Sequence, residues 1–168
     1  MALLKCILYI AGIGILANLI GAALPRSWFH PDRFPFRCQK WEQGGQIYEK
    51  IGIRVWKDKL PDMSKVVHNL YRKEVDPRPN AENLERLIQE TCVAELSHYV
   101  LLLLSLAVTR IWHGVGGWVV WGLCILGNLP FSIIQRFNRP RLQRTLDRLR
   151  AREAARACNG RARTSVAE

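Results

Sequence analysis

A run of nineteen apolar residues from Cys6 to Leu24, interrupted only by Asn18, constrains this chain more than any other feature. At about 1.5 Å per residue, a helix of that length spans roughly the 30 Å hydrocarbon core of a bilayer. Lys5 and the small residues that follow Ile20 leave a cleaved signal peptide as an alternative. Because the run is longer than a usual signal core, we expect a retained transmembrane helix over residues 6–24.

Two further apolar runs follow a polar middle. Residues 99–109 are apolar or small, and residues 111–134 contain no Asp, Glu, Lys or Arg. The first of these runs is too short to span a bilayer alone, but extended backward it reaches that length and includes Glu95 and His98. Only Arg110 and its neighbours separate the two runs, so the sequence predicts a tight helical hairpin.

Basic residues gather in two segments on either side of this hairpin. The chain carries 25 Lys and Arg against 14 Asp and Glu, and residues 135–168 alone hold 10 Arg and 3 acidic residues. The positive-inside rule places the loop 25–90 and the C-terminal tail in the cytoplasm, for a multi-pass protein of a bacterial cell membrane. Nucleic-acid binding is another interpretation of a basic chain. Membrane topology already accounts for the charge, so we expect no nucleic-acid partner.

The other segments complete a single membrane domain over residues 1–168. The middle of the chain is rich in proline, glycine and aromatic residues, as is typical of an interfacial loop, and alternation in residues 51–56 weakly favours a strand. Asn80 is a good N-cap for the helix that follows it. The predicted order is a first span at 6–24, an interfacial loop at 25–80, a long helix at 81–110 that contains the second span, a third span at 111–134, a basic amphipathic helix at 135–157 and a frayed tail at 158–168. The predicted fold class is therefore all-α, an integral membrane protein with about three transmembrane helices.

An ionisable pair lies in the apolar part of the second helix. Glu95 and His98 are three residues apart and share a helix face, and Glu90 lies on the preceding turn. Ionisable groups inside a membrane segment are costly and by default suggest function. A carboxylate that orients an imidazole suits general-base catalysis, so His98 is the candidate base, with Glu95 and Glu90 as its partners. A polar clamp between helices and a metal site using Glu-x-x-His are the alternatives.

Amide and guanidinium side chains gather where the third span ends. Three arginines within six residues suit a phosphate or carboxylate, although a stop-transfer cluster has the same appearance. Pro130 is expected to kink the helix just before them. The candidate binding residues here are Asn128, Gln135, Arg136, Asn138, Arg139 and Arg141. A second polar motif adds Trp56, Lys57, Lys59 and Asp62 as candidates, although this motif alone is more typical of a turn with solvated charges.

Three motifs occur together in this chain: residues 56–62 (WKDKLPD), residues 90–98 (ETCVAELSH) and residues 128–142, which contain QRFNRPRL. In order and spacing they resemble the glycosyl-4,4'-diaponeurosporenoate acyltransferase family, over about residues 25–150. The last motif is the most specific. The Gly/Trp-rich hairpin and the Arg/Ala-rich tail look less like the family.

The resemblance implies a small bacterial membrane enzyme that completes a staphyloxanthin-like carotenoid. The reaction it implies is esterification of a sugar hydroxyl on a glycosylated carotenoid acid by a fatty acyl group. With His98 as base, Arg136, Asn138 and Asn128 would stabilise the acyl oxyanion, while Arg139 and Arg141 would hold a donor phosphate. We find no Gly-x-Ser-x-Gly motif, so direct transfer is expected rather than a serine intermediate.

We expect no tightly bound cofactor and no metal. The expected donor is a fatty acyl thioester of coenzyme A or of an acyl carrier protein, and the expected partners are lipid substrates, the membrane and other pigment-pathway enzymes. Two other classes stay open: a non-catalytic membrane subunit, and a metal-dependent lipid-modifying enzyme using Glu90, Glu95 and His98.

Overall fold

The computed structural model describes residues 1–60 and 80–164, with side-chain surroundings as far as residue 158. Asp62 lies outside the described residues. The elements in chain order are α1 (Ala2–Ala23), η1 (Arg26–Trp28), η2 (Lys40–Glu49), α2 (Ile53–Trp56), η3 (Lys57–Lys59), α4 (Ala81–Ser105), α5 (Val108–Ile111) and α6 (Val115–Thr164). The described part of the chain is helical and contains no strand, so the strand expected at residues 51–56 is wrong. Gly52 there has a left-handed backbone (φ 67°) that starts the short helix α2 instead.

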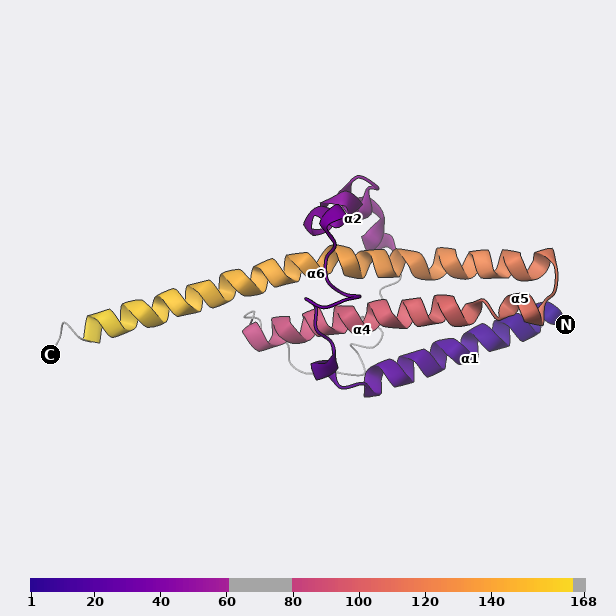
Figure 1. Cartoon of the computed structure of the whole chain (residues 1–168), viewed down its shortest axis with the longest axis horizontal. Helices are drawn as coiled ribbons and strands as arrows, with labels where there is room; N and C mark the ends of the chain where they lie inside the picture. The colour runs from indigo at the N-terminus through magenta and orange to yellow at the C-terminus, as the bar shows by residue number, and fades with distance from the viewer. Residues whose placement is uncertain (61–79, 165–168) are drawn as a thin grey trace.

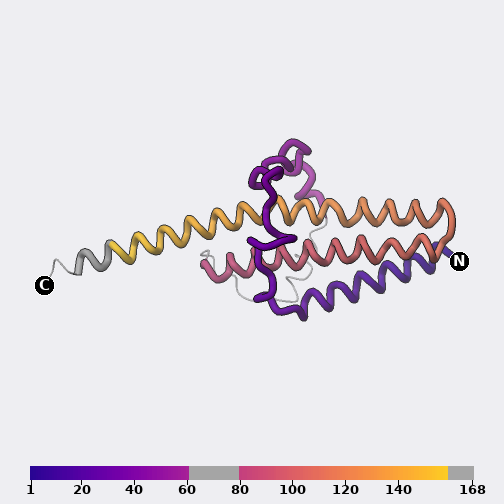
Figure 2. Tube along the Cα trace, in the orientation of Figure 1, coloured from indigo at the N-terminus to yellow at the C-terminus, as the bar shows by residue number. Residues whose placement is uncertain are grey.

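Three helices are long and apolar enough to cross a membrane, which confirms the predicted fold class: α1, the stretch Ala81–Ile111, and the stretch Val115–Cys158. They form one layered bundle in which α4 lies between α1 and α6 (Figures 1 and 2). The N-terminus and the α5–α6 turn lie at one end of the bundle, and the C-terminal part of α6 extends beyond the other end.

Two helix boundaries differ from those expected. The predicted helix 81–110 is interrupted at residues 106–107 by a turn between α4 and α5. Conversely, α6 continues through Pro130 and Pro140 without the expected division after residue 134. A proline inside a helix costs about 3 kcal/mol. Packing on both sides offsets this cost, because Ile133 and Phe137 join one apolar cluster with α2 and Leu146 joins another with α4.

The hairpin between α5 and α6 depends on the absence of a side chain at Gly117. A Cβ atom there would lie 2.2 Å from the carbonyl oxygen of Trp112 and 2.8 Å from Cα of Thr109. We expect G117A to lower the free energy of unfolding by about 2 kcal/mol because the turn must open. Thermal unfolding in detergent tests this, with G122A on the same helix as control, since a Cβ at Gly122 meets no atom within 4 Å apart from the adjacent backbone of its own helix. Equal midpoints for the two variants would show that the turn adjusts without cost.

The described segment from residue 24 to residue 60, called the crossing loop below, crosses the bundle and packs against both α4 and α6. Phe29 and Phe36 pack against Cys92 and Val93 of α4. Further along, Ile53 and Tyr48 pack against Phe137, on the side of α6 that faces away from α4. In Figure 1, α2 lies above α6 on this side. This path brings loop carbonyl and carboxylate groups to the line where α4 meets α6.

Candidate functional site

Arg136, on α6, is surrounded by acceptors from three parts of the chain. Its Nε and Nη2 atoms donate to the two carboxylate oxygens of Glu42, each at 2.6 Å, and Nη1 donates to Glu95 of α4 at 2.7 Å. The carbonyl oxygens of Pro35 and Arg37 accept from Nη1 and Nη2 at 3.1 and 3.3 Å. All five N–H groups of this guanidinium therefore have protein acceptors.

Arg139, one turn further along α6, is bonded in the same manner. Its Nε donates to the Thr91 hydroxyl at 2.9 Å, and Nη1 donates to the Phe36 carbonyl at 2.7 Å. Its Nη2 donates to the Thr91 carbonyl and to Glu95. The hydroxyl of Tyr99 donates to Glu95 at 2.8 Å, so Glu95 accepts from three side chains.

These residues form a charge-balanced network that is largely buried, with the Arg136 side chain 11% exposed. Glu95, Glu42 and Arg139 are 0%, 1% and 2% exposed, and two guanidinium groups meet two carboxylates. Buried ions are tolerated only when they are paired and hydrogen-bonded. Arg136 and Arg139 were expected to bind a ligand, yet their donors are used within the protein. The network joins α4, α6 and the crossing loop.

Glu42 is held ionised by this network. Burial alone would raise the pKa of Glu42, but hydrogen bonds from Arg136, the Tyr48 hydroxyl and the Gln39 N–H outweigh it and leave the pKa below its ordinary value of 4.5. Burial, followed by the bond to Glu42, raises the pKa of Tyr48 well above its ordinary value. The proton between them therefore stays on the tyrosine at neutral pH.

A pH-dependent contribution to stability follows from the lowered pKa of Glu42. The ionised carboxylate stabilises the fold above the ordinary carboxyl pKa, and this contribution is lost as the pH falls through the lower folded-state pKa. We expect E42Q to lose roughly 2 kcal/mol at pH 7, with a gap to wild type that shrinks below about pH 4. Unfolding midpoints measured from pH 7 to pH 3 test this, and a constant gap would contradict it.

His98 contacts Asn128 rather than Glu95. Its Nδ1 atom lies 3.0 Å from the Asn128 Oδ1 atom, and its ring stacks on Phe131 with centroids 5.2 Å apart and planes 13° apart. Among the described residues, Glu95 bonds to Arg136, Arg139 and Tyr99 and not to His98. The two helix neighbours thus share a face but meet different partners on α6.

The orientation of Asn128 fixes the imidazole tautomer. The Asn128 Nδ2 group donates to the Cys124 carbonyl at 2.9 Å, which leaves Oδ1 as the acceptor facing His98. Nδ1 of His98 must then carry the hydrogen, and Nε2 keeps its lone pair. Nε2 has no hydrogen-bond partner among the described residues. This arrangement is that of a positioned general base.

Two further amides lie on the His98 side of α6. Asn128, Phe131, Gln135 and Asn138 follow one another at spacings of three and four, so they share a helix face. Gln135 and Asn138 are half-buried, and neither side chain is bonded to a described residue. Asn128 precedes Arg136 by eight residues, or about 12 Å of helix. The imidazole is thus deeper in the membrane segment than the charged network.

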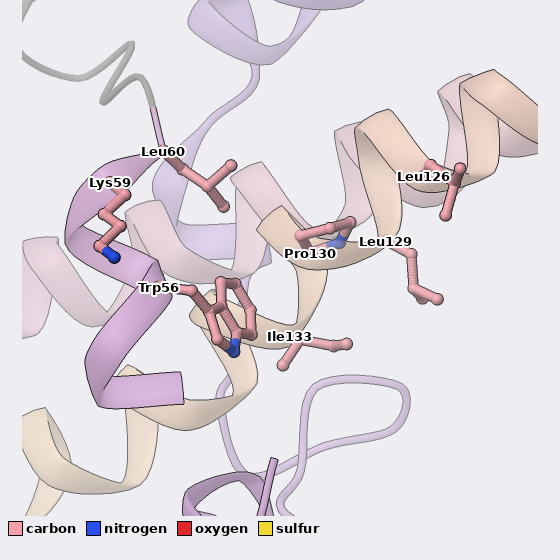
Figure 3. Close-up of a pocket in the computed structure, with 7 residues that line it drawn as sticks. All are labelled: Trp56, Lys59, Leu60, Leu126, Leu129, Pro130 and Ile133. Atoms are coloured by element: carbon pink, nitrogen blue, oxygen red, sulfur yellow. The ribbon is translucent and has the colours of Figure 1, made fainter. Parts of the chain in front are cut away.

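The remaining sequence candidates lie away from His98. Glu90 pairs with Arg26 at 2.8 Å, where α1 ends, and Arg141 pairs with Glu49 at 2.6 Å. Trp56 and Lys59 line a cavity of about 320 Å³ on the outer side of α6, together with Leu126, Leu129, Pro130, Ile133 and Leu60 (Figure 3). Lys57 pairs with the adjacent Asp58 at 2.6 Å. No group of three or more His, Cys, Asp or Glu side chains that could hold a metal ion occurs in the described part of the chain.

Three ionisable members of the network are missing from the sequence-based candidates: Glu42, Tyr48 and Tyr99. Glu42 comes from a loop, and its one local signal is the capping box in which Gln39 and Glu42 bond each other three residues apart. Tyr99 follows His98 directly and resembles any aromatic residue at the start of an apolar run. Tertiary proximity, rather than local pattern, identifies all three.

Comparison with known proteins gives a consistent match. Residues 25–148 match the family model described as glycosyl-4,4'-diaponeurosporenoate acyltransferase. Proteins of that name from Staphylococcus aureus strains MRSA252 and N315 are 30% identical to this chain over 138 residues, which is 82% of this chain and 82% of each relative. No solved structure matches the chain.

Proposed function

Because the chain belongs to the glycosyl-4,4'-diaponeurosporenoate acyltransferase family, we propose that it transfers a fatty acyl group to a sugar hydroxyl of a glycosylated carotenoid acid, using His98 as the general base. Membership makes the chain an acyltransferase of carotenoid pigment synthesis with membrane-spanning helices. The observation that carries the residue assignment is the bond between His98 and Asn128, which leaves Nε2 free to accept a proton.

In the proposed reaction the sugar oxygen attacks the carbonyl carbon of a fatty acyl thioester. His98 Nε2 takes the hydroxyl proton as the new C–O bond forms, and returns it to the thiolate as the C–S bond breaks. Asn128 keeps the ring in one tautomer and accepts a stronger hydrogen bond from the imidazolium. The thioester belongs to coenzyme A or to an acyl carrier protein, and no metal or other cofactor takes part.

The amide groups beside His98 suit a sugar acceptor. Gln135 lies one turn from Phe131, and its side chain is a donor for the developing oxyanion or for a neighbouring hydroxyl. Asn138 lies a further turn toward the end of the membrane segment, where a glycosyl head group would enter. Both residues lie on the side of α6 that carries Asn128.

The proposed membrane is the bacterial cell membrane, with the loop 25–90 and the tail in the cytoplasm. Support comes from the basic segments and from the bundle, in which the described loop residues 25–60 and the C-terminal part of α6 lie away from the hairpin end (Figure 1). A cytoplasmic loop side places a soluble thioester on the same side of the membrane as the loop and the tail.

The test is expression in a host that accumulates the glycosylated carotenoid acid. Mass spectrometry of lipid extracts is expected to show a product heavier by one fatty acid minus one water with the chain, and no such product with the empty vector. A known family enzyme serves as positive control. No product from this chain beside an active control would favour another acceptor or the non-catalytic membrane subunit.

A further inference from the structure

The C-terminal part of α6 carries a row of arginines on one face. Arg141, Arg144, Arg148, Arg152 and Arg156 follow one another at spacings of three or four residues, so they form a continuous stripe about 22 Å long. We call these five residues the arginine stripe. Arg144, Arg148, Arg152 and Arg156 are exposed. Within the described residues no carboxylate pairs with any of these four, whereas Arg141 pairs with Glu49 and the off-stripe Arg150 pairs with Glu85.

The C-terminal end of the stripe, with Arg152 and Arg156, lies beyond the body of the bundle. Leu142, Leu146 and Leu149 still pack against the start of α4, but every side chain from residue 151 to 158 is exposed. In Figure 1 this part of α6 extends past the other helices without a neighbour. Arg144 donates to the Gly44 carbonyl at 3.4 Å, but nothing within the described chain bonds to the guanidinium groups of Arg148, Arg152 and Arg156.

The position of the stripe argues against a lipid surface as its partner. The helix is continuous from the membrane segment through Pro140, so it leads the arginines away from the bilayer. Arg152 and Arg156 follow Arg136 by 16 and 20 residues, which is about 24 and 30 Å of helix. Attraction to anionic head groups falls off within a Debye length, which is about 8 Å at physiological salt. A soluble acidic partner meets these side chains more readily.

We propose that the arginine stripe docks an acidic acyl carrier protein, which delivers the fatty acyl thioester from the cytoplasm. This inference rests on the proposed function and names its donor. Acyl carrier proteins are small, strongly acidic helical proteins, and opposite charges along facing helices guide such encounters. Their thioester is carried on a long flexible arm. Arg141 and Arg144 follow Phe131, which stacks on His98, by 10 and 13 residues, or about 15 and 20 Å of helix.

The experiment compares two double variants of the full chain in nanodiscs of neutral phosphatidylcholine. R148Q/R152Q removes two charges from the stripe, and R33Q/K40Q removes two from exposed positions of the crossing loop. The probe is a bacterial acyl carrier protein loaded with palmitate. We expect the Kd to rise about tenfold in the stripe variant and by less than about twofold in the control. In turnover, the KM for the loaded carrier rises by the same factor, while kcat and the KM for palmitoyl-coenzyme A stay unchanged.

Three results of the binding experiment would overturn the docking inference: no saturable binding by the wild type, equal weakening in both double variants, or a stripe variant that binds like the wild type. Carrier binding can be measured without turnover, so failure of the docking inference can be distinguished from failure of the proposed function. Turnover with palmitoyl-coenzyme A but no carrier binding refutes docking alone, and carrier binding without any turnover refutes the proposed function alone.

The membrane alternative is tested with a spin label on the exposed Cys158, after replacing Cys38 by serine. We expect the label to stay accessible to water in anionic nanodiscs, and its burial in lipid would overturn the inference.

Discussion

Replacing His98 by alanine is expected to lower acyl transfer by roughly 10² to 10⁴-fold while the protein stays folded. The reason is that Nε2 is the one basic atom of the His98–Asn128 pair without a partner among the described residues. The measurement is the rate of acylated-pigment formation at matched membrane levels of protein. The control is H113A, which removes an exposed histidine at the hairpin and is expected to leave the rate unchanged.

A second substitution separates catalysis from packing. N128A leaves the imidazole in place but removes the acceptor that fixes its tautomer. We expect a smaller loss of rate, roughly tenfold, which corresponds to about one hydrogen bond. Wild-type rates in H98A would remove His98 from the mechanism. Loss of folded H98A, together with a fully active N128A, would assign the histidine to helix packing.

The largest effect on stability is expected from E95Q. Glu95 accepts from Arg136, Arg139 and Tyr99 and is fully buried, so the neutral amide leaves a buried positive charge without its counterion. Removing one partner of a buried ion pair costs about 3–5 kcal/mol. Thermal unfolding in detergent and the yield of folded protein measure the loss.

Two controls define the source of that loss. E90Q makes the same chemical change on the same helix, but Glu90 forms a partly exposed pair with Arg26, so we expect at most about 1 kcal/mol. The double variant E95Q/R139Q restores charge balance, because Arg136 keeps Glu42. It is expected to be more stable than the sum of the single changes indicates. An E95Q protein as stable as E90Q would mean that the network is dispensable.

Sequence patterns predicted the three long helices because apolar runs set their length and number regardless of how they pack. The same patterns selected Glu95, His98, Asn128, Arg136 and Arg139, since polar groups in such segments stand out. The pairing that the sequence patterns predicted for these residues differs from the pairing in the structure, however. Helical spacing shows that Glu95 and His98 share a face, but each finds its partner across the interface with α6.

The contacts of Glu42 could not be predicted from the sequence, because they depend on the path of the crossing loop. Glu42 reaches Arg136 across 94 positions of the chain, and no local signal encodes that distance. The course of α6 through Pro130 and Pro140 was missed for a related reason. A proline rule describes an isolated helix, whereas apolar packing on both sides of α6 decides the outcome.

The buried network also has a consequence for how the chain is made. Its members are synthesised one after another: first the loop with Glu42, then α4 with Glu95, and finally α6 with Arg136 and Arg139. The charges of α4 and α6 are paired in the membrane only when both helices are present. The turn between α5 and α6 is short enough for the two helices to insert together. The newly made loop therefore waits at the membrane surface, and the protein acquires its final shape only when its last third has been synthesised.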